Sequence, residues 1–350
     1  MKPKLPIIST TPTLPLWCNT ILPASVGEYA FELALCAQLE SSDDAIVSRQ
    51  LGGAVVNPDR RVLDVVVVEP GPAFEIRARL TDATIPRRIL EAPIGAGSFR
   101  DWRRVLGDGI AAEKAIEQAI DIGILEIDHD RGRELVRLVD RYPEDWFDRI
   151  IAIENKPHLD EPGALYDQLQ FDVSLALVDA VVLVTESYVT RAHRNRLPDE
   201  IGIWRFDPGE GSLKVVVEAS ELETGDPGVE IARQHTGRAE IDIVDVTSKR
   251  HARRHLAERA YGKGWRTYRF PPCRQLEPDV GPVPGGPFCT HFDRLIRPER
   301  DCGPGCPGFK PGPPPSVDLD GLRAANSPWK RNPPDRRRHQ ASLAHFISDQ

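Results

Sequence analysis

One short stretch constrains the fold more than any other: the apolar residues 150–153 run directly into Glu154, Asn155, Lys156 and Pro157. An uninterrupted apolar run of this length, closed by proline, predicts a short strand buried on both faces. Side chains two positions apart project from the same face of a strand, so Glu154 and Lys156 should lie together at its end. Two interpretations follow: a surface ion pair of little energetic weight, or a carboxylate and an ammonium group in a functional site.

Length and composition limit the interpretation of the other segments. A chain of 350 residues has room for two domains, or for one domain with large insertions. Its contents of 40% apolar and 28% charged residues are ordinary for a globular protein. The net charge of −8 argues against a protein that coats nucleic acid non-specifically. An enzyme with a local basic patch is compatible with that charge.

Nothing in the sequence predicts a membrane protein or a secreted protein. No apolar run approaches the roughly 18 residues that span a bilayer, and the N-terminal segment lacks the apolar region of a secretory signal. Six cysteines without such a signal favour thiols or metal ligands over disulfides. We therefore expect a cytoplasmic protein without a membrane partner.

Apolar patterns predict an α/β core in which the opening stretch is one strand of several. The expected elements are a helix at about 27–40, strands at 54–59, 61–68 and 150–153, a helix at 163–178, and strands at 180–185, 201–206 and 213–219. A helix between two apolar strands implies a crossover connection, and therefore parallel neighbours in one sheet. Asp64 lies inside an otherwise apolar strand, where a buried carboxylate needs an ionic partner or a metal.

Composition also divides the chain into segments. We expect an irregular lead-in at 1–24, a core at 25–220 with an insertion at about 71–148, a basic helical and strand extension at 221–270, a cysteine- and proline-rich module at 271–315, and a flexible tail at 316–350. Helices at 111–122 and 133–140 around a strand at 124–127 predict a helical insertion, with a small winged-helix-like lobe as the alternative. A basic helix near 248–261 is a candidate for phosphate contact, unless its cations form only a solvated face.

The order of these elements and their polar residues resembles the PD-(D/E)XK nuclease superfamily, in its RecB-like branch. Asp64 matches the acid of the second core strand of that superfamily, and Glu154 with Lys156 matches the (D/E)XK motif of the third. The resemblance covers roughly residues 25–215. Its most similar stretches also resemble an uncharacterised haloarchaeal family, and so an archaeal one, that is assigned to the superfamily: 61–71, 150–157 and 168–187.

Two further positions match less specific parts of the pattern. Glu32 falls where many members carry an extra acid on the first helix, and Gln168 with Phe171 looks like the glutamine-and-aromatic helix motif of the RecB-like branch. Each position has a structural alternative, because both Glu32 and Gln168 could be solvent-facing helix residues.

The resemblance implies a restriction-endonuclease-like αβββαβ core and a metal-dependent nuclease that hydrolyses phosphodiester bonds. DNA is the expected substrate, and RNA stays open. Asp64 and Glu154, with the backbone carbonyl of Asn155, offer hard oxygen ligands for Mg²⁺ or Mn²⁺. Lys156 would hold the attacking water or stabilise the anionic transition state. Gln168 would orient the lysine, the water or the substrate backbone.

Two features depart from the superfamily pattern. The gap between the second and third core strands is unusually long, and Asp64 follows Leu63 rather than a proline. Asp59, which follows Pro58 in the turn before the strand, is a rival for the metal-binding acid. The alternative function is a non-catalytic nucleic-acid-binding or regulatory protein on a decayed nuclease fold.

Four cysteines fall in the proline-rich module, which holds 13 of the 32 prolines and can build little regular structure. Cys273, Cys289, Cys302 and Cys306 have the spacing C-x15-C-x12-C-x3-C, and the last pair flanks a tight Gly-Pro-Gly turn. We expect these thiols to hold Zn²⁺ or an iron–sulfur cluster; the alternative is unpaired thiols in a loose loop. Possible substitute ligands are His291, Cys18 and Cys36.

Overall fold

The computed structural model describes most of the chain between residues 27 and 330. The described ranges are 27–42, 44–57, 60–80, 86, 88–89, 92–95, 98–121, 124–139, 143–159 and 164–330. The predicted lead-in at 1–24, the rival acid Asp59, Cys18 and the end of the predicted tail lie outside these residues.

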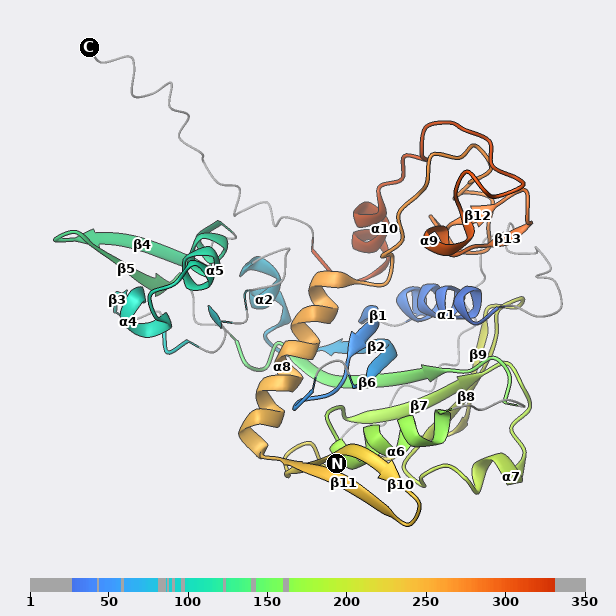
Figure 1. The fold of residues 1–350 in the computed structure, drawn as a ribbon, viewed down its shortest axis with the longest axis horizontal. Helices are drawn as coiled ribbons and strands as arrows, with labels where there is room; N and C mark the ends of the chain where they lie inside the picture. The colour runs from blue at the N-terminus through green and yellow to red at the C-terminus, as the bar shows by residue number, and fades with distance from the viewer. Residues whose placement is uncertain are drawn as a thin grey trace.

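A six-stranded mixed sheet forms the centre of the protein (Figure 1). Its strand order is β1-β2-β6-β7-β8-β9, with antiparallel pairs at both ends and parallel pairs between β6, β7 and β8. The strands are β1 (Ile46–Gly52), β2 (Val62–Pro70), β6 (Phe147–Asn155), β7 (Ala180–Thr185), β8 (Gly202–Asp207) and β9 (Ser212–Val217). The predictions of an α/β fold, of parallel β6 and β7, and of strands at 201–206 and 213–219 are confirmed.

Alternating side chains of β2 and β6 supply a separate core on each face of the sheet. Val65 and Ile153 face helix α1 (Glu28–Ser42), whereas Val66 and Ala152 face α6 (Leu165–Leu175) and α8 (Val246–Lys263). Figure 1 accordingly shows α1 above the sheet and α6 below it. Both faces of these strands are buried, which explains why their sequences are almost continuously apolar.

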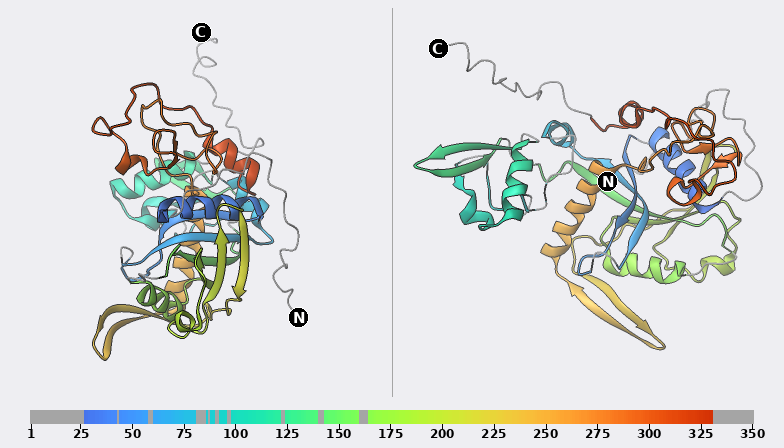
Figure 2. Two further views of the ribbon diagram at one scale, coloured as in Figure 1. Left: turned by 90° about the vertical axis from the view of Figure 1, so that its right-hand side faces the viewer. Right: turned by 45° about the horizontal axis from the view of Figure 1, so that its top comes forward.

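The insertion between β2 and β6 is a separate lobe that projects away from the sheet (Figure 2). After α2 (Phe74–Leu80), its elements are β3 (Arg100–Asp101), α4 (Trp102–Leu106), α5 (Ile110–Asp121), β4 (Leu125–Asp130) and β5 (Arg133–Leu138). The three strands form an antiparallel sheet in the order β3-β5-β4 around a small core of their own. Gly71 marks the departure point, where a side chain would collide with the backbone of residues 145 and 147.

The prediction of a plain helical insertion is therefore wrong, because the lobe contains a three-stranded antiparallel sheet. The expected helix at 111–122 and strand at 124–127 are confirmed as α5 and β4. Residues 133–140 were expected to be helical because of their charges, but they contain β5. Arg131 and Gly132 both adopt positive φ angles, 50° and 79°, as a tight hairpin turn requires. That turn folds β5 back onto β4, and the pairing overrides the local helical pattern.

The predicted strand at 54–59 is also wrong. The strand preceding β2 is β1, several residues earlier, and residues 53–57 form a loop. The reason is the buried carboxylate of Glu230, on β10, which accepts the backbone N–H groups of Val55 (2.7 Å), Val56 (2.8 Å) and Asn57 (3.2 Å). Those donors are unavailable to a sheet partner.

Beyond β9 the chain adds a hairpin, a long helix and the cysteine module. The elements are α7 (Arg191–Arg194) before β8, then β10 (Gly228–His235), β11 (Arg238–Val244), α8, β12 (Phe288–Cys289), β13 (Arg294–Leu295), α9 (Pro298–Asp301) and α10 (Leu319–Asn326). A wholly flexible tail from residue 316 is not observed. In α10, Arg323 is buried and donates to the carbonyl of Tyr261 at 2.8 Å, and Trp329 is buried as well.

Candidate active site

Asp64 and Glu154 meet where two neighbouring strands separate. The antiparallel ladder of β2 and β6 ends at the pair Val65–Ile153, so the next position sets Asp64 opposite Glu154. β6 stays paired with β7 for two more residues, through Glu154 and Asn155. The Asp64 carboxylate bridges the resulting gap, because its Oδ2 accepts the backbone N–H of Asn155 at 3.1 Å. The fork thus brings together the two predicted acids.

Glu154 is buried and ion-paired, which contradicts the interpretation of a surface pair with Lys156. Its Oε2 accepts Nη2 of Arg61 at 2.7 Å, and only 6% of the residue is exposed. The same guanidinium donates through Nε and Nη2 to both oxygens of Asp172, at 2.9 and 2.6 Å. A bidentate arginine–carboxylate pair has a fixed geometry, so Arg61 and Asp172 hold the Glu154 carboxylate in one orientation.

The pKa values of the acids at the fork are raised. Burial, and then the charge of Asp64, raise the pKa of Glu154 to about 8, although Arg61 opposes the shift. Burial also raises the pKa values of Asp64, Asp172 and Glu32. Buried carboxylates that repel one another bind either a proton or a cation. The site therefore has the electrostatic character of a cation or proton-transfer site.

Glu32, on α1, is connected to the fork rather than facing solvent. It is 3% exposed, is ion-paired with Arg49, and accepts the side-chain amide of Asn155 at 3.2 Å. The amide of Gln50 joins the two acids by donating to Glu32 at 3.0 Å and to Asp64 at 3.3 Å. Gln50 has a φ of 53°, a strained left-handed conformation for a residue other than glycine. The strand pairs on either side of Gln50 set it opposite Asp64, so strain is concentrated at the site.

Lys156 lies just past the end of β6, beside α1. Its backbone N–H donates to the carbonyl of Val184 at 2.9 Å, and its Nζ donates to Glu28 at 3.4 Å. The side chain is 26% exposed and is ion-paired with Glu28, so the ammonium group is partly accessible from solvent. The structure does not pair it with Glu154.

Gln168 lies on α6, one helical turn before Asp172. Residues four apart share a helix face, so Gln168 is on the side that carries the Arg61 contact. It is partly buried, and its side chain makes no hydrogen bond within the described residues. The fork thus brings together Asp64, Glu154 and Glu32, while Lys156 and Gln168 lie at its border.

Sequence reasoning missed Arg61, Asp172 and Gln50 as members of the site. Asp172 carried a usable signal, because it shares the buried stripe of α6 with Leu165 and Leu169 at helical spacing. An acid at a core position requires a partner. Arg61 and Gln50 gave no comparable signal, since arginine or glutamine beside a strand is unremarkable.

The four late cysteines lie close enough together for their charges to interact. Burial, and then the charges of Cys289, Cys273 and Cys306, raise the pKa of Cys302 to about 11. The backbone N–H of Lys310 donates to Sγ of Cys273 at 3.5 Å. All four are thiols, and Cys36 is a separate thiol in the core under α1.

Neither cluster is a preformed multidentate metal cage. Across the described residues, no group of three or more His, Cys, Asp or Glu side chains is arranged to hold a metal ion. At the fork, Arg61 occupies one Glu154 oxygen, and in the module none of the four described cysteines forms a disulfide.

Fold and site together define a mixed α/β protein with a buried acidic site at a fork in its central sheet. The chain belongs to a family of unknown function (DUF5787), whose model matches residues 46–311. That range includes Asp64, Glu154 and all four late cysteines, but not α1. Comparisons with curated proteins and with solved structures find no match. None of the described helices has the length and apolarity required to cross a membrane.

Proposed function

We propose that the protein is a metal-dependent nuclease that hydrolyses phosphodiester bonds of DNA. The observation that carries the proposal is the fork, which sets Asp64 opposite Glu154, with Lys156 two positions further along the chain. The element order α1-β1-β2-β6-α6-β7 supports it, because this is the αβββαβ order of the PD-(D/E)XK core. The lobe accounts for the long gap between the second and third core strands.

The residues at the fork fit a hard divalent cation. Asp64 and Glu154 would hold Mg²⁺ or Mn²⁺ together with the carbonyl of Asn155. A cation would stabilise the ionised carboxylates, which burial, and at Glu154 also the charge of Asp64, disfavours by raising their pKa values. Mg²⁺ commonly uses only one or two carboxylates and takes its other ligands from water and substrate phosphates. When bound, such a metal lowers the pKa of water and polarises a phosphoryl oxygen.

The chain's own residues would position and neutralise the substrate. The partly exposed ammonium of Lys156, which is ion-paired with Glu28, would contact the phosphate or orient the attacking water. Arg61 and Asp172 would keep Glu154 in place, and Gln50 would link Asp64 to Glu32. Gln168, whose amide makes no hydrogen bond in the described structure, would orient the lysine or the substrate backbone.

The cysteine module is proposed to hold Zn²⁺ or an iron–sulfur cluster as a structural element. Four thiols within one electrostatic field fit a soft cation that would stabilise their thiolate forms.

The test is cleavage of supercoiled plasmid and end-labelled linear DNA with Mg²⁺ or Mn²⁺. Asp64→Asn and Glu154→Gln should each lower the rate by at least about 100-fold, because each removes charge that stabilises the transition state. Two substitutions at exposed sites serve as matched controls: Asp148→Asn, on the same strand as Glu154, and Glu117→Gln, on α5.

Equal cleavage by the wild type and both site variants would show that the activity comes from elsewhere. Salt-dependent DNA binding with no cleavage under either metal would instead favour a non-catalytic binding protein.

A further inference from the structure

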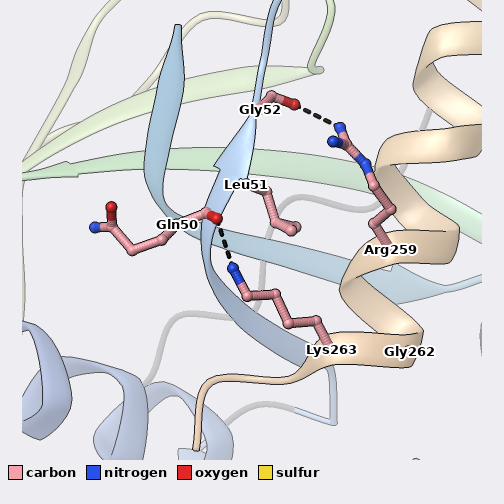
Figure 3. Close-up of a pocket in the computed structure, with 6 residues that line it drawn as sticks. All are labelled: Gln50, Leu51, Gly52, Arg259, Gly262 and Lys263. Atoms are coloured by element: carbon pink, nitrogen blue, oxygen red, sulfur yellow. Dashed lines mark hydrogen bonds between the residues drawn. The ribbon is translucent and has the colours of Figure 1, made fainter. Parts of the chain in front are cut away.

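A pocket of about 380 Å³ lies between the end of β1 and the C-terminal part of α8, next to the acid site (Figure 3). It is lined by Gln50, Leu51, Gly52, Arg259, Gly262 and Lys263. The two charged residues in this lining are both cations, so the pocket has the opposite charge to the fork.

Gln50 belongs to both the pocket and the fork. Its backbone carbonyl accepts Nζ of Lys263 at 2.6 Å on the pocket side. Its side chain points away from α8 in Figure 3 and donates to Glu32 and Asp64. A single residue therefore separates a ligand in the pocket from the carboxylates proposed to act on the substrate.

Other cations of α8 bind groups away from the pocket, whereas Arg259 and Lys263 line it. Arg253 donates to the carbonyl of Leu177 at 2.8 Å and pairs with Asp179, and buried Lys249 donates to the carbonyl of Glu223 at 3.0 Å. The candidate phosphate contact of this helix is therefore limited to its C-terminal turns, where Arg259 and Lys263 line a cavity.

The two cations of the pocket, Arg259 and Lys263, are positioned to bind an anion. Arg259 donates to the carbonyl of Gly52 at 2.5 Å, which fixes its guanidinium at the pocket wall. Lys263 is exposed, and its bond to Gln50 uses one of the three N–H groups of an ammonium. Burial, and then repulsion from Arg49 and Arg259, lower the pKa of Lys263. A bound anion would offset this repulsion.

We propose that this pocket binds a phosphate group of the nucleic-acid strand, next to the bond held at Asp64 and Glu154. The inference rests on the proposed function and extends it, because it gives the substrate a second anchoring point on α8. The ligand chemistry is a phosphate oxyanion, supplied either by a terminal 5′-phosphate or by an internal phosphodiester.

The experiment measures binding without cleavage, by fluorescence anisotropy of 3′-labelled oligonucleotides in EDTA over a range of salt concentrations. One oligonucleotide carries a 5′-phosphate and the other a 5′-hydroxyl. Lys263→Gln should weaken binding about fivefold and reduce the slope of log affinity against log salt by about 0.7–0.9. Lys263→Arg should retain both values, and Lys114→Gln, an exposed lysine on α5, is the matched control.

A loss confined to the 5′-phosphorylated strand identifies the terminal phosphate as the ligand, and an equal loss on both strands identifies an internal one. Affinity and slope equal to those of the Lys114→Gln control would overturn the proposal.

The two proposals fail separately. Cleavage that depends on Asp64, together with unchanged binding by Lys263→Gln, overturns the pocket alone. Binding that depends on Lys263, without metal-dependent cleavage, overturns the nuclease alone.

Discussion

The acid site and the cysteine module place their polar groups on very different supports. Gln50, Asp64 and Glu154 come from three adjacent strands, whose pairing sets them at one level of a sheet with a core on each face. The cysteines come from two-residue strands and turns, with a small apolar cluster around Leu276 and Ile296.

Because of this difference, the fold by itself can maintain the geometry of one site but not of the other. Strand register and the Arg61 ion pairs fix the acids whether or not a cation is present. The module has little regular secondary structure and only a small apolar cluster beside its cysteines, although Val283, Phe288 and Leu295 pack into the core under α1. Its cysteine-bearing turns therefore need a cross-link to stay together. We therefore expect metal loss to inactivate the first site and to unfold the second.

The largest expected effect follows from breaking the module. Cys302→Ala should remove the proposed Zn²⁺ or iron–sulfur cluster and destabilise residues 271–315 by on the order of 5 kcal/mol or more, because structural metal sites contribute strongly to folding. Elemental analysis for zinc and iron, with limited proteolysis, measures both effects. Cys36→Ala is the matched control, since this buried thiol lies in the other core. Unchanged metal content in Cys302→Ala would contradict the proposal that the cysteine module, unlike the acid site, depends on a bound metal for its fold.

A smaller effect is expected from breaking the ion pairs of the acid site. Arg61→Met leaves Glu154 and Asp172 buried without their cation, and loss of one partner from a buried pair costs about 3–5 kcal/mol. The free energy of unfolding by urea measures this cost. Arg104→Met, at a side chain that is 78% exposed, should change stability by less than about 0.5 kcal/mol. Equal stabilities of the two variants would contradict the structural role given to Arg61.

The smallest effect is a pH dependence specific to the acid site in the metal-free protein. The folded chain keeps a proton on Glu154 up to a pKa of about 8, whereas the unfolded chain releases it near the ordinary value of 4.5. The folded state binds more protons in this window, so stability should fall as pH rises from about 4.5 to 8.

Substituting Glu154 by glutamine should remove this decrease in the free energy of unfolding. At pH 8 the variant should be more stable than wild type by roughly 2–4 kcal/mol, since one pKa unit corresponds to about 1.4 kcal/mol. Thermal and urea unfolding at several pH values measure the difference. The Glu117→Gln variant should show the same dependence of stability on pH as wild type. If Glu154→Gln also showed the wild-type slope, a raised pKa of Glu154 would be excluded as its cause.

Much of the sheet could be predicted because its strands are continuously apolar. The stretches around Val65, Ile151 and Val182 have this pattern, and Asp64 and Glu154 stood out as acids that interrupt or end such runs. That these two acids share a site was implied by the resemblance to the PD-(D/E)XK superfamily. β5 could not be predicted, because its pattern of charges is helical and only the turn at Arg131 and Gly132 makes it a strand.

The support of the acid site was beyond sequence reasoning for a different reason. Arg61 and Asp172 are 111 positions apart, and their ion pair exists only after β2 and α6 have packed. Likewise, the loop before β2 is determined by Glu230, more than 170 positions later. Such contacts leave no periodic pattern in either segment.

Mn²⁺ binding measured by calorimetry near pH 8.5 is the most direct test of whether Asp64 and Glu154 form one cation site. Wild type and Glu117→Gln should bind one Mn²⁺ with equal affinity. Asp64→Asn and Glu154→Gln should each weaken that binding at least about tenfold, because each removes one of the two carboxylate ligands. Unchanged Mn²⁺ affinity in either variant would show that the two carboxylates do not share a cation, and would contradict the account of the fork.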